Sequence, residues 1–196
     1  MKPTKLFVAL CVAGLSAGVF AQSVQEIQQR DVNQQQRIEN SLKDGSLNTR
    51  EAARLERDER NVNKLEANAL KDGKLTPAER TRITNAENRA SRDIQQARTN
   101  GVKGDPLSAS SQRMQADVQR NINQDQRIEN GIKKGTLTNK EVGRLDAGQA
   151  RVDGKESRSG QDGHVNAGEQ ANVQQAENKQ SQKIHKLKTN QAERAL

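Results

Sequence analysis

Apolar residues along most of this chain recur at the three- and four-residue intervals of an amphipathic helix. Two clear stripes are Ala52, Leu55, Val62, Leu65 and Ala69, and Ile83, Ala86, Ala90, Ile94 and Ala97. This period indicates helices and lacks the alternation typical of strands. We therefore predict an all-α fold with helices over 23–44, 48–71, 76–98, 112–134, 138–157 and 166–188.

The sequence repeats itself without a gap after 126 − 36 = 90 positions, because Gln36-Arg37-Ile38-Glu39-Asn40 returns unchanged at 126–130. Such self-similarity marks an internal duplication. It predicts two tandem copies of a three-helix unit built from αα-hairpins. The first copy covers 22–100, a linker covers 101–111, the second copy covers 112–190, and a C-terminal tail covers 191–196.

Four stretches combine a helix stop with a helix start. Each has a glycine suited to the left-handed position after a helix end, an Asn or Thr N-cap, and a Glu three residues later that completes a capping box. We expect structural helix caps at Gly45, Asn48, Glu51, Gly73, Thr76, Glu79, Gly135, Thr138, Glu141, Gly163, Asn166 and Glu169.

The predicted helices contain few apolar residues with which to form a core. Several positions on the apolar seams are polar, namely Gln35, Glu59, Asp125 and Gln149. The second copy also contains Gly143, Gly148, Gly154 and Gly160, each costing up to about 1 kcal/mol relative to alanine in a helix. We expect fraying or a long loop over 154–163, and an elongated fold of loosely packed hairpins or a homodimer.

The N-terminus has the pattern of a cleaved signal peptide over 1–21. Lys2 and Lys5 precede an apolar run that ends near Gly18, and Ala21 is a small residue suited to cleavage. The run is shorter than the roughly 20 residues of a membrane span, so we expect no stable membrane anchor after cleavage. The mature chain would be periplasmic or secreted, with a charge of 31 − 25 = +6.

Cleavage would remove the chain's only cysteine, Cys11, and its only aromatic residues, Phe7 and Phe20. Nucleic-acid binding is then disfavoured, since no ring could stack on a base. His164 and His185 each lack a second histidine or cysteine at helical metal-ligand spacing. No catalytic or phosphate-binding motif is present either. We predict no enzyme activity, no cofactor and no metal-ligating residue.

Two patterns leave binding functions open. Asp72-Gly73-x-Leu75-Thr76-x-x-Glu79 matches the second half of an EF-hand loop, whereas the third loop position, Leu70, offers no oxygen ligand. This keeps a degenerate calcium binder as one alternative. Basic residues also gather near the C-terminus, at Lys179, Lys183, Lys186, Lys188 and Arg194. They indicate an alternative role in binding an anionic envelope polymer or lipid surface.

The repeated Gly-x-Leu-Thr-x-x-Glu unit resembles that of uncharacterised small exported proteobacterial proteins with helical repeats, a resemblance that implies no activity. The segments 75–79 and 137–141 also resemble the Leu-Thr-x-x-Gln motif of the Spy/CpxP periplasmic stress-protein family, with Glu79 and Glu141 where that family has Gln. That resemblance implies a helical dimer acting as a chaperone or stress-sensor inhibitor. The leading expectation is therefore a non-enzymatic periplasmic protein that binds another protein and is stress-related or chaperone-like.

Overall fold

A computed structural model describes residues 16–190, with side chains from residue 23 onward, and its regular structure is entirely α-helical. The helices are α1 (Ser16–Lys43), α2 (Thr49–Ala69), α3 (Pro77–Thr99), α4 (Ala109–Lys133), α5 (Asn139–Ser159) and α6 (Ala167–Thr189). Five of the six begin and end close to the predicted positions. The exception is α1, which starts earlier than expected. Helix α4 begins three residues early, inside the expected linker, because Ser108 caps it.

The expected signal peptide, 1–21, lies largely outside the described residues, and the tail 191–196 lies wholly outside them. The expected cleavage point after Ala21 falls within the backbone of α1. Among the described helices, none combines the length and the apolar character needed to cross a bilayer.

The caps form as the local sequence indicates. Capping boxes at Asn48, Thr76, Thr138 and Asn166 begin α2, α3, α5 and α6. The glycines that precede them have positive φ angles, at Gly45, Gly73, Gly135 and Gly163. These local signals therefore set where each helix hairpin turns.

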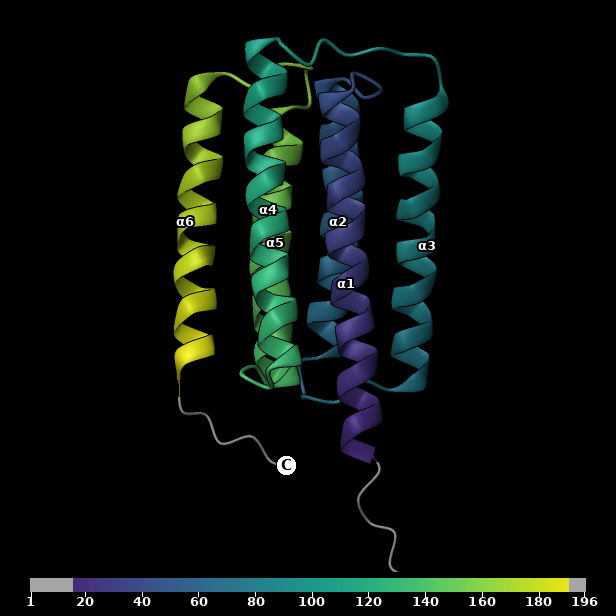
Figure 1. The fold of residues 1–196 in the computed structure, drawn as a ribbon, viewed down its shortest axis with the longest axis vertical. Helices are drawn as coiled ribbons and strands as arrows, with labels where there is room; N and C mark the ends of the chain where they lie inside the picture. The colour runs from purple at the N-terminus through teal and green to yellow at the C-terminus, as the bar shows by residue number, and fades with distance from the viewer. Residues whose placement is uncertain (1–15, 191–196) are drawn as a thin grey trace, which may run out of the picture.

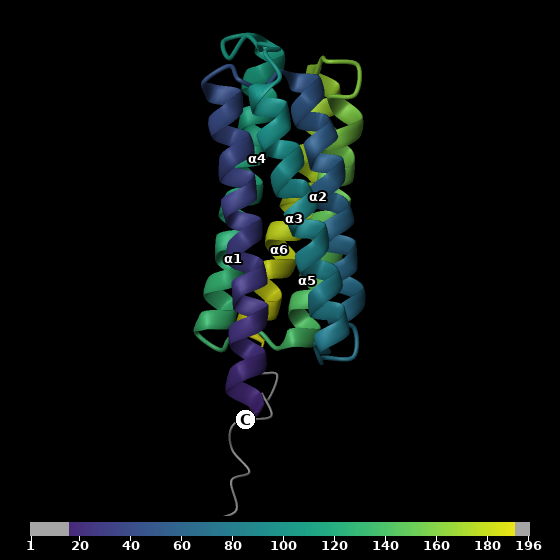
Figure 2. The same cartoon turned by 90° about the vertical axis from the view of Figure 1, so that its right-hand side faces the viewer.

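The two copies pack side by side around a shared interior. Helix α2 packs most extensively against α5, and α1 against α4, so each close pair joins one copy to the other. Helix α3 covers α1 and α2 on one flank, and α6 covers α4 and α5 on the opposite flank (Figures 1 and 2). The expectation of loosely packed hairpins in series is wrong, because the duplicated halves bury their seams against each other.

Helix α5 is continuous through Gly143, Gly148 and Gly154 and ends at Ser159 with Gly160 as its C-cap, so the predicted fraying or long loop over 154–163 is wrong for 154–159, and the turn begins only at Gly160. These glycines allow close approach of neighbouring helices. A Cβ atom on Gly143 would lie 2.8 Å from Leu70 Cβ, and one on Gly148 would overlap the side chain of Gln180. Packing against α2 and α6 thus offsets the low helix propensity of glycine.

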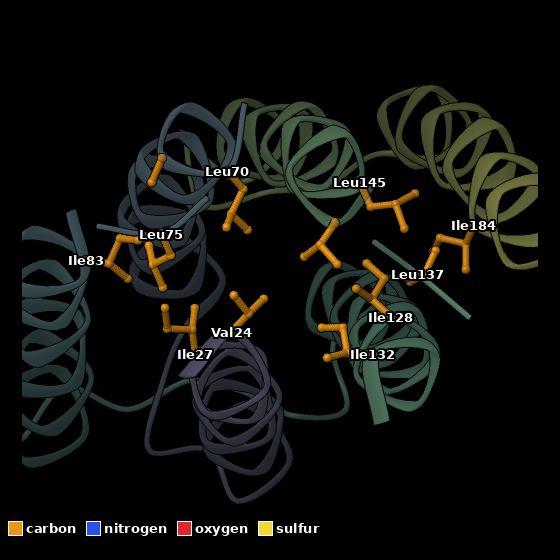
Figure 3. Close-up of a cluster of buried hydrophobic side chains, with 12 residues drawn as sticks. Val24, Ile27, Leu70, Leu75, Ile83, Ile128, Ile132, Leu137, Leu145 and Ile184 are labelled. Carbon is orange, nitrogen blue, oxygen red and sulfur yellow. The ribbon is translucent and has the colours of Figure 1, made fainter. Parts of the chain in front are cut away.

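The apolar core is divided between the two ends of the bundle. At one end, side chains from all six helices or their flanking turns meet, including Val24, Leu70 and Ile83 from the first copy with Leu145 and Ile184 from the second (Figure 3). A second cluster at the other end joins Ile38, Leu47 and Ile94 to Met114 and Ile122. Between these clusters the interior is predominantly polar.

Candidate functional site

The middle of the bundle contains a concentration of buried carboxyl groups. On α2, Glu56, Glu59 and Glu66 follow the spacing of a helix face that points to the interior, and Asp146, Asp153 and Glu156 do the same on α5. Glu39 and Glu129 are also buried but pair with Lys43 and Lys133, and Glu141 serves a capping box. The remaining interior carboxyls are Asp31, Glu56, Glu59, Glu66, Glu87, Asp117, Asp125, Asp146, Asp153, Glu156 and Glu177, each at most 4% exposed.

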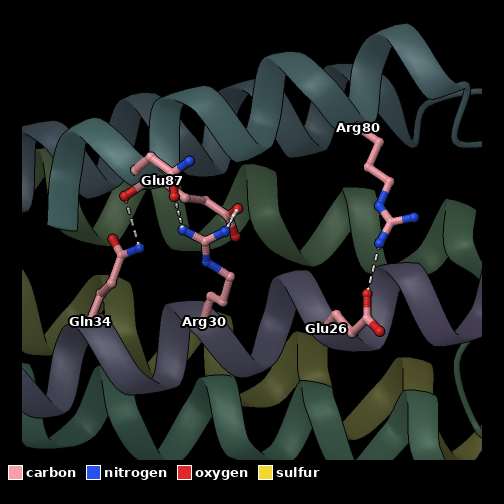
Figure 4. Close-up of polar contacts among 6 residues, drawn as sticks. Glu26, Arg30, Gln34, Arg80 and Glu87 are labelled. Carbon is pink, nitrogen blue, oxygen red and sulfur yellow. Dashed lines mark hydrogen bonds and ion pairs between the residues drawn. The ribbon is translucent and has the colours of Figure 1, made fainter.

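Basic side chains do not balance this charge. No lysine or arginine is among the buried residues of the described part of the chain. Arg30 reaches Glu87 at 3.1 Å from a partly exposed position (Figure 4). Arg120 reaches Glu177 in the second copy at the same distance and is also partly exposed. Eleven ionised carboxylates against two arginines would leave 11 − 2 = 9 negative charges.

Nine uncompensated charges are incompatible with a folded chain of this size. Each unpaired buried ion costs several kcal/mol after relaxation, whereas a whole domain is stable by about 5–15 kcal/mol. The folded interior must therefore hold positive charge, either as protons on the carboxyl groups or as bound cations.

The first of two tight clusters joins Asp31, Glu66 and Glu87 from α1, α2 and α3. One oxygen from each of these carboxylates lies within 4.8 Å of the others. Gln28 links the cluster to the second copy, because its Nε2 donates to Asp31 Oδ2 at 3.1 Å and to Asp146 Oδ1 at 3.2 Å. Neither oxygen of Glu66 has a hydrogen-bond partner among the described residues, although Glu66 is fully buried.

The second cluster joins Glu56 from α2 to Asp153 and Glu156 from α5, again with one oxygen of each within 4.8 Å of the others. Three amides donate to these carboxylates: Asn121 to Glu156 at 2.7 Å, Gln35 to Glu56 at 3.1 Å and Asn63 to Asp153 at 2.9 Å. Asn121 and Gln35 also each have a second polar atom, the amide carbonyl oxygen.

The carbonyl oxygens of Asn121 and Gln35 are buried and have no hydrogen-bond partner within the described chain. They are neutral groups, independent of the acidic ones, and each is held at the cluster through its own NH₂ group. A buried carbonyl without a donor costs about 1–3 kcal/mol. The second cluster thus combines three carboxylates, the ligands that hard cations prefer, with two amides whose carbonyl oxygens lack a donor.

The duplication makes the two copies complementary within this interior. Asn63 and Asp153 stand 90 positions apart and hydrogen-bond to each other across the α2–α5 contact. The same shift relates Asp31 to Asn121 and converts the carboxylate into an amide. An amide can donate to a carboxylate where two carboxylates would repel. Across the two copies Asn63 supplies a donor to Asp153, whereas Asn121 donates to Glu156 within the second copy.

Burial dominates the electrostatics of the interior carboxyls. Loss of solvation raises the pKa of Glu56 and of Glu87 to about 7, and the pKa of Asp125 to about 8. Burial also raises the pKa of Glu66 well above its usual range, and the nearby Asp146 carboxyl adds to this effect. Glu56 also hydrogen-bonds to Glu156, an arrangement that requires a proton on one of the two carboxyls.

The EF-hand-like segments and the two histidines lie outside the two interior carboxylate clusters. The carboxylates of the EF-hand-like segments are held by backbone N–H groups: Asp72 Oδ1 accepts from Lys74 N, and Glu79 Oε2 accepts from Thr76 N, each at 2.9 Å. This arrangement gives a calcium loop no support. His164 and His185 are exposed on a turn and on α6.

Only part of the predicted basic surface near the C-terminus stays free. Lys183 donates to the backbone oxygen of Arg144, and Lys188 donates to the backbone oxygen of Arg127 at 2.7 Å. Lys179 and Lys186 are exposed on α6, and Arg194 lies outside the described residues. Two of the four residues that the structure describes are thus held by backbone contacts, and binding of a polyanion by this region stays a prediction.

Sequence reasoning detected several interior polar residues without recognising a site. Gln35, Glu59, Asp125 and Gln149 stood out as polar positions on apolar seams, and all four are buried. The spacing of Glu56, Glu59, Asn63 and Glu66 carried a further signal, since carboxyl or amide groups fill one face of α2 for three turns.

Large apolar side chains are scarce on the surface of the described chain, with Leu65, Val102 and Leu107 exposed. A client-binding surface would need more apolar area. The chaperone-like role accordingly stays a prediction, and this surface gives it little support.

No protein-family model matches the chain, and neither a curated protein nor a solved structure does.

Proposed function

We propose that this chain is an exported, non-enzymatic helical bundle that binds hard divalent cations among its interior carboxylates. One observation carries the proposal: two trios of buried carboxylates have oxygens within 4.8 Å of one another, with too little basic charge to balance them. The second site takes its carboxylates from both copies of the three-helix unit, whereas the first takes all three from the first copy and reaches the second copy through Gln28. Export to the periplasm or beyond rests on the signal-peptide pattern of residues 1–21.

The donor chemistry selects the class of cation. Carboxylate and amide oxygens suit Ca²⁺, Mg²⁺ and Mn²⁺, whereas Zn²⁺ and Cu²⁺ favour imidazole or thiolate ligands. The described residues contain no cysteine, and both histidines are exposed and belong to neither trio. A cation bound at a trio would replace protons that the carboxyls otherwise retain, so that binding and folding are coupled.

The first test is the melting temperature of the mature protein at pH 7.5 with a chelator or with 1 mM Ca²⁺, Mg²⁺ or Mn²⁺. A cation present at 100 times its dissociation constant stabilises the fold by about 2.7 kcal/mol. Such a gain raises the melting temperature of a chain of this size by roughly 5–10 °C. We expect a saturable increase with at least one of the three ions.

Matched variants separate binding in the interior from binding at the surface. Glu66→Gln and Glu156→Gln each remove one interior carboxylate, and Glu26→Gln removes an exposed one. The interior variants should melt higher than the wild type in chelator, because the folded state no longer has to keep a proton on that carboxyl at pH 7.5, and they should gain less from the cation. An equal gain for all three variants, or no gain for the wild type, would contradict the proposal.

A further inference from the structure

The outward faces of α2 and α5 carry the basic charge that the interior lacks. Because the buried acids of these helices point inward, the neighbouring arginines and lysines face solvent. Arg54, Arg57 and Lys64 on α2 are exposed, as are Arg151 and Arg158 on α5. Two hollows of about 470 and 480 Å³ lie between the helices, and their basic lining consists of Arg50, Arg54, Arg57, Arg60, Lys64, Arg151, Lys155 and Arg158. We call these two hollows together the α2–α5 groove.

The two hollows adjoin because they share Arg60, Gly154 and Arg158. Glycine at position 154 permits this arrangement. A Cβ there would lie 3.0 Å from both Cδ and Nε of Arg60, so the absence of a side chain lets the arginine lie across the floor of the groove. The groove therefore continues from one end of the α2–α5 contact toward the other.

The groove's basic side chains lack acidic partners. The six ion pairs found in the described chain use Arg30, Lys43, Arg80, Arg98, Arg120 and Lys133, none of which lines the groove. Glu51 is the one acid in the lining, and its carboxylate accepts from Asn48 N at 3.1 Å and from Asn100 Nδ2 at 2.6 Å. The lining of the groove is thus strongly basic, although Asp58, which lies outside the lining, offsets part of the charge of Arg54 and Arg57.

We propose that the α2–α5 groove binds a linear anionic polymer that bears phosphate groups and no nucleobases. Arg50 and Lys64 are 14 residues apart on α2, which at 1.5 Å per residue spaces their backbones by about 21 Å. Successive anionic groups along a chain can engage a row of this length. Arginine guanidinium groups suit it, because each can donate two hydrogen bonds to one phosphate.

The shape and composition of the groove favour a polymer over a membrane surface. The groove is concave, and none of the exposed large apolar side chains, Leu65, Val102 and Leu107, lines it. A protein that lies on a bilayer generally inserts apolar side chains below the headgroups. A polymer also needs no aromatic residue, whereas single-stranded nucleic acid commonly stacks its bases on such residues.

The test compares two triple variants that lose the same charge. Arg57→Gln/Arg60→Gln/Arg158→Gln changes the groove, and Arg82→Gln/Arg89→Gln/Arg92→Gln changes exposed arginines of α3. Binding of labelled inorganic polyphosphate to the mature protein is followed by fluorescence anisotropy at several salt concentrations. We expect roughly tenfold or greater weakening for the groove variant, since each contact to a phosphate adds to affinity and salt dependence, and about twofold or less for the control.

Three results would overturn the proposal: no binding by the wild type, equal weakening in both triple variants, or stronger competition by vesicles of anionic lipid than by unlabelled polyphosphate. Stronger competition by single-stranded DNA would likewise reassign the groove to nucleic acid. Circular dichroism verifies that each variant folds. If the groove triple variant unfolds, Arg151→Gln and Arg158→Gln are measured singly, and each should weaken binding by about twofold to fivefold while Arg89→Gln does not.

Discussion

Replacing Asp125 by asparagine should make the fold less sensitive to pH. The Asp125 side chain is buried on α4 and accepts a hydrogen bond from Gln149 Nε2 at 2.7 Å. Asparagine has the same shape, and its carbonyl oxygen can accept the same bond. The substitution thus removes an ionisable group from the interior and leaves the packing nearly unchanged.

The magnitude follows from the pKa of this carboxyl. Burial raises the pKa of Asp125 from 3.8 to about 8. The folded state therefore holds a proton that the unfolded state releases, and stability is lost as the pH rises from about 4 to about 8. At about 1.4 kcal/mol per pH unit, Asp125 alone should cost the wild type roughly 3–4 kcal/mol between pH 5 and pH 8.

Urea unfolding of the mature protein at pH 5, 6, 7 and 8, in the presence of a chelator, measures this loss. The difference in unfolding free energy between pH 5 and pH 8 should be smaller in Asp125→Asn than in the wild type by that amount. Asp105→Asn, at an exposed turn, is the matched control and should retain the wild-type dependence. Identical pH dependence in Asp125→Asn and the wild type would show that Asp125 is not held protonated in the folded interior.

Three further predictions address packing, capping and charge. Gly143→Ala should lower the free energy of unfolding by about 1–3 kcal/mol, because the new methyl would meet Leu70 of α2, whereas helix propensity alone predicts a gain of up to about 1 kcal/mol. Asn48→Ala should cost about 1 kcal/mol in the same urea assay, since the Glu51 N–H loses its acceptor; no change would show that this cap is dispensable. Arg120→Gln should destabilise the fold more at pH 8 than at pH 5. Burial raises the pKa of its partner Glu177 to about 8, and the ion pair exists only when that carboxyl is ionised. Equal losses of unfolding free energy at both pH values would contradict this.

Helix positions could be predicted because their signals are local. Asn48 and Glu51 lie three residues apart and form their capping box within a single turn, as do Thr138 and Glu141. The glycine before each box needs only its own backbone conformation. Such features depend on few residues, and sequence alone contains them.

The pairing of the two copies could not be predicted in the same way. Gly143 reads as a weak point in a helix taken alone, yet it is the place where α5 meets Leu70 of α2. The interior acids were missed for a related reason. Glu59 and Asp125 interrupt apolar stripes, and polarity at such positions taken alone predicts weak packing. The packing of α3 against α1 and α2 brings the first trio together, and the packing of α2 against α5 brings the second together.

Anomalous diffraction from crystals of the mature protein grown with Mn²⁺ at pH 7.5 would show directly whether the interior carboxylates bind cations. If they do, anomalous peaks lie inside the bundle, among Asp31, Glu66 and Glu87, among Glu56, Asp153 and Glu156, or at both places. Peaks confined to exposed carboxylates such as Asp72, or an interior without any peak, would contradict the proposed binding.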